Sequence, residues 1–306
     1  MILKRKDNRE LDVYELERLL ALPLTSNQKF SIERELKFLH SGDKGEQDSA
    51  YFLDFSFKSS NNIIIIHDLR LEHLGHTAQI DHLLINRFLD FYILESKSFF
   101  YGVEITDNGE FMAWTGKGYQ GIESPIEQNK RHIELLQKII KANDIMPKRI
   151  GVTLSPSFKS YVLISPKSRI VRPSGSKFGT SSVIKADMFN SAYDESLDKR
   201  SDIDTLLSVT KIVSTEAVIG IGKNLIKLHK TGKINYAAKF GIKENSQSKL
   251  IKQIATEIID GNICSACGGE VSKKAFKYCK ENKIFFGGKM LCYKCQDALR
   301  KLNHLV

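Results

Sequence analysis

The cysteines are the feature that most constrains how this chain can fold. All five lie after residue 263, and four of them form two Cys-x-x-Cys pairs separated by 24 residues, namely Cys264 with Cys267 and Cys292 with Cys295. In a cytoplasmic protein, paired motifs of this kind are typical of a zinc site and not of disulfides. A module of about 45 residues also needs such a metal, because its own core is small. We therefore predict one structural Zn²⁺ in a small zinc ribbon over residues 259–306.

The remaining residues of this segment are basic and aromatic in alternation. Lysines suit contacts with phosphate and aromatic rings suit base stacking, so we expect nucleic acid at five lysines: Lys273, Lys274, Lys277, Lys289 and Lys294. The other interpretation is that the aromatic rings form the small core of the ribbon. We expect Cys279 to be a buried thiol, and the sequence leaves open whether it replaces one of the four zinc ligands.

The net charge of +10 is concentrated towards the C-terminus. Residues 1–198 hold 26 Lys/Arg and 27 Asp/Glu, whereas residues 199–306 hold 20 Lys/Arg and 9 Asp/Glu. This distribution predicts a polyanionic partner for the last third of the chain, the alternative being a solvated lysine-rich surface. The chain has no run near the roughly 20 apolar residues that a membrane-spanning helix needs and no apolar signal-peptide core after Met1, so we expect a cytoplasmic protein.

The sequence pattern changes from helical to strand-like near residue 60. Charged helices are expected first, with a break at Gly42 that separates a helix over residues 27–40 from the next one. The β-branched run Ile63–Ile66 predicts a buried strand, and residues 79–86 and 89–96 predict a hairpin. Another hairpin is expected over residues 102–114, with its turn at residues 107–109. Ser124 and Pro125, with Glu127, are typical of the start of a capped helix, which we expect to run to about Ala142.

A carboxylate and lysine set lies on the first predicted hairpin. Asp81 belongs to one strand, and Glu95 and Lys97 lie two residues apart on the next, where their side chains point to the same face. Two carboxylates can hold one or two Mg²⁺ ions, which polarise a phosphate and lower the pKa of a water, while a lysine positions that water or offsets charge. This set fits phosphodiester hydrolysis, although the spacing alone is common at strand ends.

Several segments around this set occur in a characteristic order: Gly42-Asp43-Lys44-Gly45-Glu46, Ala78-Gln79-Ile80-Asp81-His82, Ile93-Leu94-Glu95-Ser96-Lys97, Trp114 and residues 124–132. The order closely resembles the nuclease-related domain (NERD), a branch of the PD-(D/E)xK nuclease superfamily, over about residues 40–165. The resemblance implies an α/β fold with a mixed sheet flanked by helices. It also implies that Asp81, Glu95 and Lys97 form the catalytic core with Mg²⁺ or Mn²⁺, that Glu46 adds a carboxylate to the metal site, and that Gln128 supplies a further polar group.

Each of these residues also has a purely structural interpretation. Glu46 could be an acidic residue favoured near a helix N-terminus, and Gln128 an exposed helix residue. Ser98 follows Lys97 where the family often has asparagine. Four histidines near the first strands are expected at strand ends or on the surface, with His82 on the face opposite Asp81: His67, His73, His76 and His82. We expect Trp114, the only tryptophan, in the core and not in a base-stacking platform.

Together these features predict four segments: an N-terminal helical segment over residues 1–40, the nuclease-like domain over 41–195, a basic helical linker over 196–258, and the zinc ribbon over 259–306. The predicted function is metal-dependent hydrolysis of phosphodiester bonds, most readily in DNA, with the linker and ribbon at the nucleic acid. The alternatives are a nucleic-acid-binding protein without catalysis, and a nuclease subunit that is active only with a protein partner in a DNA-processing or defence complex.

Overall fold

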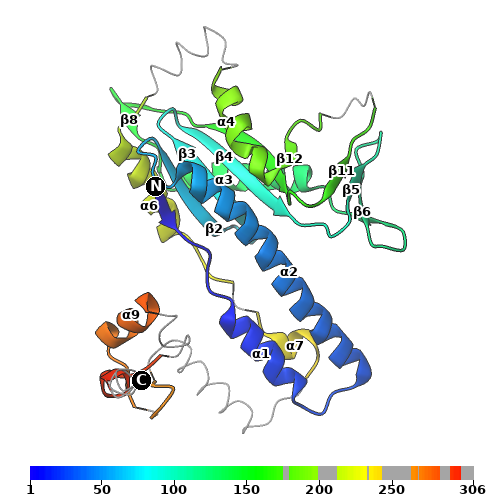
Figure 1. Cartoon of the computed structure of the whole chain (residues 1–306). Helices are drawn as coiled ribbons and strands as arrows, with labels where there is room; N and C mark the ends of the chain where they lie inside the picture. The colour runs from blue at the N-terminus through cyan, green and yellow to red at the C-terminus, as the bar shows by residue number, and fades with distance from the viewer. Residues whose placement is uncertain are drawn as a thin grey trace, which may run out of the picture. The chain divides into compact units, whose positions relative to one another are not determined.

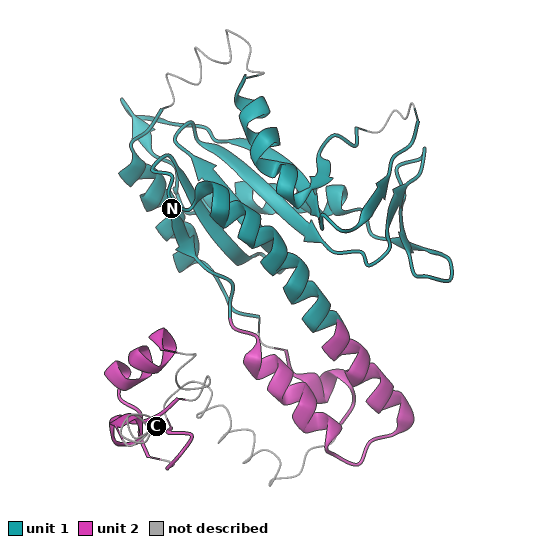
Figure 2. Ribbon diagram, in the orientation of Figure 1, with its two compact units in different colours: residues 1–7, 38–232 teal, residues 8–37, 233–306 magenta. Residues whose placement is uncertain are grey.

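The computed structural model of the chain describes residues 1–174, 179–198, 212–232, 234–242, 263–267, 269–282 and 290–297. Two compact units are coloured separately in Figure 2: Met1–Asp7 with Phe38–Gly232, and Asn8–Lys37 with Lys233–Val306. The four segments expected from the sequence stay a prediction of the domain limits.

A mixed sheet organises the first unit. Within the described residues it has six strands in the order β1-β2-β3-β4-β10-β12. Their bounds are β1 Ile2–Lys4, β2 Ile63–His73, β3 His76–Asn86, β4 Asp90–Lys97, β10 Ser157–Ile164 and β12 Val183–Lys185. The strands β2, β3 and β4 run antiparallel, and β1, β10 and β12 join them in parallel pairings. The predicted α/β class and the hairpin of β3 and β4 are confirmed.

Helices cover both faces of this sheet (Figure 1). On one face pack α3 (Pro125–Ala142) and α6 (Thr215–Lys227). On the other lie the end of α2 (Ser26–Phe57), the short 3₁₀ turn η1 (Ala186–Met188) and α4 (Phe189–Asp198). A strand covered on both faces has no solvated side, which explains why all of Ile63–Ile66 is apolar and buried.

Helix α3 begins as the sequence predicts. The Ser124 hydroxyl accepts a hydrogen bond from the Glu127 amide, and Pro125 occupies the first turn, where its missing N–H costs nothing. The side chain of Asn129 is fully buried and donates to the carbonyl of Tyr161 on β10 at 3.0 Å and to that of Ile93 on β4 at 3.4 Å. These bonds fix the first turns of α3 against the two strands.

A second sheet is formed by three strands between β4 and α3 together with β11, which follows β10. In the described part of the chain it has four strands in the order β11-β5-β6-β7, with bounds β5 Gly102–Ile105, β6 Phe111–Trp114, β7 Tyr119–Ile122 and β11 Arg169–Val171. The predicted hairpin over residues 102–114 is confirmed, with Gly109 at φ 83° in its turn. A separate cluster of apolar side chains, which includes Val103, Phe111 and Ile164, packs this sheet against β10. Residues 148–153 form the short hairpin β8 (Lys148–Arg149) and β9 (Val152–Thr153).

Two predictions near the N-terminus are wrong. Helix α2 continues through Gly42 without a break, because a single glycine weakens a helix only slightly and the packing of both ends holds it. Residues Ile2–Lys4, expected to be helical, form the strand β1 beside β2. Strand pairing across some 60 positions of sequence leaves no local pattern from which it could be predicted.

The second unit contains short helical elements. Helix α1 (Glu10–Leu20) lies within the predicted N-terminal helical segment, with Leu16 and Leu19 buried, and α7 (Tyr236–Lys239) contacts it. The C-terminal segment contains α9 (Lys273–Glu281) between the two cysteine pairs. Much of the predicted linker over residues 196–258 lies outside the described residues. Among the helices that the structure describes, none has the length and apolar character to cross a membrane.

Candidate active site and metal centre

Strands β3 and β4 bring the first two predicted residues together. The register pairs His82 with Leu94, so that Asp81 and Glu95 are the next neighbours along the two strands. The Ser96 backbone N–H donates a hydrogen bond of 2.8 Å to Asp81 Oδ2. This bond fixes the Asp81 carboxylate beside β4, close to where Glu95 and Lys97 emerge on one face.

Lys97 links β4 to helix α3. Its ammonium lies 2.6 Å from Glu95 Oε1 and donates to Gln128 Oε1 at 3.2 Å. Gln128 is next to Asn129, whose buried amide holds this turn of α3 on the sheet. The structure therefore brings Asp81, Glu95, Lys97 and Gln128 into one site.

Helix α2 supplies the fifth predicted group, Glu46. Its carboxylate lies 2.7 Å from the ammonium of Lys6, which also lies 2.5 Å from Asp43 Oδ1. A side chain at Gly45 would place its Cβ 2.8 Å from the Cβ of Ser98, just after β4, so the helix approaches the strand closely here. Lys6 is a member of the site that the sequence reasoning missed, because it is some 40 positions from Glu46.

The pKa values show that the carboxylates crowd one another. Burial, followed by the charges of Glu95 and Glu46, raises the pKa of Asp81 well above its usual range. Burial also raises the pKa of Glu95 and of Glu46, although Lys97 and Lys6 respectively act against the shift. Burial lowers the pKa of Lys97, but Glu95 and Asp81 outweigh that effect and the pKa is raised, so Lys97 stays protonated. A cation among these groups would favour the ionised carboxylates.

The donor set fits a hard divalent cation. Glu95 is 3% exposed, and its Oε2 atom is buried without a hydrogen-bond partner among the described residues. An unpartnered buried carboxylate oxygen is costly unless a cation binds it. Mg²⁺ is commonly held by one or two carboxylates plus water and substrate phosphate, so the three carboxylates need not converge as tightly as zinc ligands do.

The histidines near the strands include a buried pair. His67 Nδ1 lies 2.7 Å from His82 Nδ1, and the outer nitrogens reach Asp54 Oδ1 and Ser96 Oγ, each at 2.9 Å. Burial lowers the pKa of both histidines, so both are neutral. The expectation of surface or strand-end roles is wrong for this pair, which is held inside by a chain of hydrogen bonds that spans strands β2, β3 and β4. His82 lies on the face opposite Asp81, as expected.

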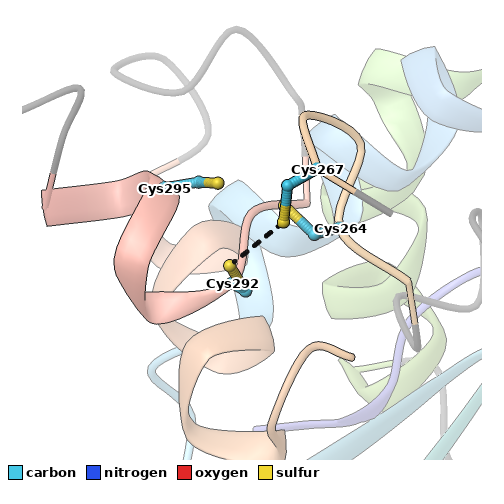
Figure 3. A group of neighbouring side chains, drawn as sticks. All are labelled: Cys264, Cys267, Cys292 and Cys295. Atoms are coloured by element: carbon cyan, nitrogen blue, oxygen red, sulfur yellow. Dashed lines mark hydrogen bonds between the residues drawn. The ribbon is translucent and has the colours of Figure 1, made fainter. Parts of the chain in front are cut away.

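The four cysteines of the two pairs form a compact group in the second unit (Figure 3). Their sulfur atoms all lie within 4.8 Å of one another, and those of Cys267 and Cys292 are 3.7 Å apart. Hydrogen bonds with the other three thiols raise the pKa of Cys295 to about 12, which reflects how closely the four side chains are grouped. Within the described ranges no other group of three or more potential ligands is so closely spaced. The four side chains are positioned to bind a metal.

Cys279 lies apart from this group. It is buried on α9, where its sulfur accepts hydrogen bonds from the Leu291 amide at 3.3 Å and the Gln296 side chain at 3.1 Å. These contacts support the buried thiol that the sequence suggested. The loop between its helix and the second cysteine pair lies outside the described residues.

Four of the five lysines predicted to contact nucleic acid are described, and all four are exposed. Lys273, Lys274 and Lys277 lie on α9 and Lys294 lies in the second cysteine pair, while Lys289 lies outside the described residues. Tyr293 is also exposed, so not every ring of this segment belongs to its core.

The prediction for Trp114 is wrong. The side chain is 37% exposed at the end of β6, and its ring lies 4.9 Å from that of Tyr119 on β7. An edge-to-face pair on neighbouring strands stabilises the sheet and at the same time leaves aromatic faces open to solvent.

One comparison with known proteins gives a match. Residues 41–165 match the family model described as the nuclease-related domain, while no curated protein and no solved structure matches the chain. The matched segment contains α2 from Ser41 onward, strands β2 to β7 and helix α3, and thus every element that carries Asp81, Glu95, Lys97, Glu46 and Gln128. The chain therefore contains a nuclease-related domain over residues 41–165.

Proposed function

We propose that this protein is a divalent-metal-dependent nuclease that hydrolyses phosphodiester bonds, with DNA as the favoured substrate. One observation carries the proposal: Lys97 is bound to Glu95 beside Asp81, and a buried oxygen of Glu95 has no partner among the described residues. The two carboxylates can bind a divalent metal ion, and the Lys97 ammonium can contact a phosphate. Metal-assisted phosphodiester hydrolysis uses groups of both kinds.

Asp81 and Glu95 would hold Mg²⁺ or Mn²⁺, with Glu46 as a further oxygen donor. A bound ion there supplies a Lewis acid for the phosphate and lowers the pKa of a bound water. Lys97 is protonated and would donate a hydrogen bond to the phosphate or to the attacking water, offsetting the charge that develops in the transition state. Gln128 would keep the Lys97 ammonium in position through its 3.2 Å hydrogen bond.

The C-terminal segment would bind one structural Zn²⁺ through Cys264, Cys267, Cys292 and Cys295. Four thiolates close the coordination sphere, so this ion would stabilise the module and take no part in the reaction. The exposed lysines of α9 and the excess of basic residues after residue 198 support a role in holding nucleic acid. A cytoplasmic location belongs to the same proposal.

The proposal is tested by incubating plasmid and linear DNA with the zinc-loaded protein in Mg²⁺, in Mn²⁺ and without added metal. The Lys97→Ala variant should lose cleavage by about a hundredfold or more, because a fixed charge at the transition state is removed. Lys138→Ala, an exposed lysine on α3, is the matched control and should cleave normally. Cleavage that needs no divalent metal, or that survives Lys97→Ala, would refute the proposal.

The second candidate function is nucleic-acid binding without catalysis. The excess of basic residues in the last third of the chain supports the binding. That protein would bind DNA or RNA with a strong salt dependence and would bind equally well after Glu95→Ala. The remaining alternative is a nuclease that is active only with a protein partner. It is tested by adding a cell extract to the cleavage assay, since such a nuclease would cleave DNA only when the extract is present. Loss of that activation in Cys264→Ser would point to the cysteine module as the partner's contact.

A further inference from the structure

A cavity of about 410 Å³ opens on the small sheet of strands β5, β6, β7 and β11. Three aromatic side chains and one arginine supply its recognition groups: Tyr101, Trp114, Tyr119 and Arg169. The three rings are between 37% and 51% exposed, and they lie together around one cavity, as interaction sites often do. The Tyr119 hydroxyl is hydrogen-bonded to Glu104, so the exposed ring surfaces are the part that a ligand can contact.

The walls of this cavity are held in place by backbone contacts. Gly102 approaches Arg169 so closely that a Cβ there would lie 2.6 Å from the Arg169 carbonyl oxygen. Gly116, at φ 90°, lies against the Tyr101 ring, with its Cβ position 3.0 Å from a ring carbon. Trp114 and Tyr119 are directly paired across β6 and β7. The cavity is therefore a preformed feature of the sheet, and binding would order few further groups.

Arg169 gives the cavity an anion-binding group. It is exposed on β11, and its charge acts on the neighbouring Tyr119 hydroxyl. A guanidinium group suits phosphate, since its donors match two phosphate oxygens at once. Aromatic faces beside a guanidinium offer the two contacts that a nucleotide makes, one to its base and one to its phosphate.

Strands β5, β6 and β7 of the small sheet are joined at both chain ends to elements of the proposed active site. Tyr101 follows Lys97 by four residues, a contour of at most about 14 Å. On the return, β7 leads through Glu123 to the N-cap of α3, and the Glu123 charge acts on Lys97. A strand whose phosphate lies at Lys97 would thus have its neighbouring nucleotides within reach of the cavity.

We propose that this cavity binds an unpaired nucleobase of the substrate, next to the bond that is cut, by stacking on Trp114 and Tyr119 with a flanking phosphate on Arg169. The inference rests on the proposed nuclease function and adds a preference for single-stranded or frayed nucleic acid. Paired bases are stacked on their neighbours and cannot enter such a cavity, whereas the open face of an unpaired base can.

Trp114 provides the measurement, since it is the only tryptophan of the chain. Tryptophan emission is recorded while a short single-stranded phosphorothioate oligonucleotide is added to the full-length protein without added divalent metal. Binding is followed in parallel by the fluorescence anisotropy of a dye on the oligonucleotide. We expect quenching with the single strand and not with the matching duplex. An oligonucleotide of the same length without bases should leave the emission unchanged.

The variants Tyr119→Ala and Arg169→Ala should each weaken single-strand binding on the order of tenfold. Tyr51→Ala, an exposed aromatic residue on α2, and Lys138→Ala are the matched controls and should bind as the unchanged protein does. Circular dichroism confirms that each variant is folded.

Three results would overturn the inference: binding that leaves the Trp114 emission unchanged, equal quenching by the strand without bases, or unchanged affinity in both cavity variants. The experiment involves no cleavage. Quenching in a protein without nuclease activity would support base binding in the cavity and reject the catalytic proposal. Cleavage without quenching would support the catalytic proposal and reject base binding in the cavity.

Discussion

At the scale of single residues, the active-site carboxylates are held in a place that disfavours their charge. Burial raises the pKa of Asp81, Glu95 and Glu46, so the folded chain holds their protons more tightly than the unfolded chain does. Their contribution to stability is therefore largest below the ordinary carboxyl pKa of about 4 and is lost as the pH rises through the raised values.

We expect this loss in the metal-free protein and not in its Mn²⁺ complex, because the ion favours the ionised carboxylates. The measurement is the midpoint of thermal unfolding across about pH 5 to 8, with and without Mn²⁺, in the unchanged protein and in Glu95→Gln. The gain from Mn²⁺ should grow with pH and should be much smaller in the variant. A gain that is the same at every pH, or the same in both proteins, would contradict the assignment of Glu95 as a metal ligand.

The residues that the sequence predicted are those whose relation is local. Glu95 and Lys97 share a strand, and Asp81 is one short hairpin away, so period-two alternation is enough to bring them together. Lys6 was missed because its contact with Glu46 joins the segment after β1 to a helix about 40 residues further along the chain. No local pattern records such a contact, and the same holds for the buried pair of His67 and His82.

At the scale of elements, α2 depends on a close approach. Gly45→Ala should reduce cleavage strongly, because the new Cβ would lie 2.8 Å from the Cβ of Ser98 and would push Glu46 away from β4. Gly42→Ala is the matched control on the same helix, since a Cβ there meets nothing within 4 Å. It should keep activity and raise the free energy of unfolding by about 0.5–1 kcal/mol, the usual gain in helix propensity.

Adding Ser98→Gly to Gly45→Ala should restore part of the lost cleavage, because it removes the atom that the new Cβ meets. Rates of DNA cleavage for the two single variants and the double variant test this coupling. A double variant as inactive as Gly45→Ala would show that the helix–strand contact is not the cause.

Helices α2 and α3 together show why the ends of an element are harder to predict than its type. Helix α3 begins where the sequence said, because Ser124 and Pro125 make their contacts within one turn. The break expected at Gly42 is absent from α2, since the cost of a glycine is small beside the packing of a 32-residue helix. A capping box depends only on residues within one turn of the helix. Whether a glycine ends a helix depends on how strongly tertiary packing stabilises that helix.

At the scale of the whole molecule, the two proposed metals have separate tasks. Cys264→Ser should abolish Zn²⁺ binding and unfold the cysteine module, because the metal supplies most of the folding free energy of so small a segment. The melting of the sheet unit should stay unchanged, since its core contains none of these residues. Zinc content by atomic absorption and differential scanning calorimetry measure the two effects.

Cys279→Ala is the matched control, because it removes a buried thiol and leaves the four-cysteine group intact. It should retain one Zn²⁺ per chain with a modest loss of stability in the module. Loss of zinc in this variant, or a shift of the sheet unit's transition in Cys264→Ser, would be inconsistent with a four-thiolate site that is energetically independent of the sheet.

Strands β5, β6 and β7 leave the main fold after β4 and return to it just before α3, so residues 102–122 form a cassette, to which β11 adds a fourth strand from beyond β10. The chain ends of this cassette are fixed by the same elements that carry Lys97 and Gln128. A different hairpin that still pairs with β11 could occupy that position without moving Asp81 or Glu95, since neither strand β3 nor strand β4 belongs to the small sheet. Exchange of this hairpin would therefore change the surface beside the carboxylates and leave the carboxylates themselves in place.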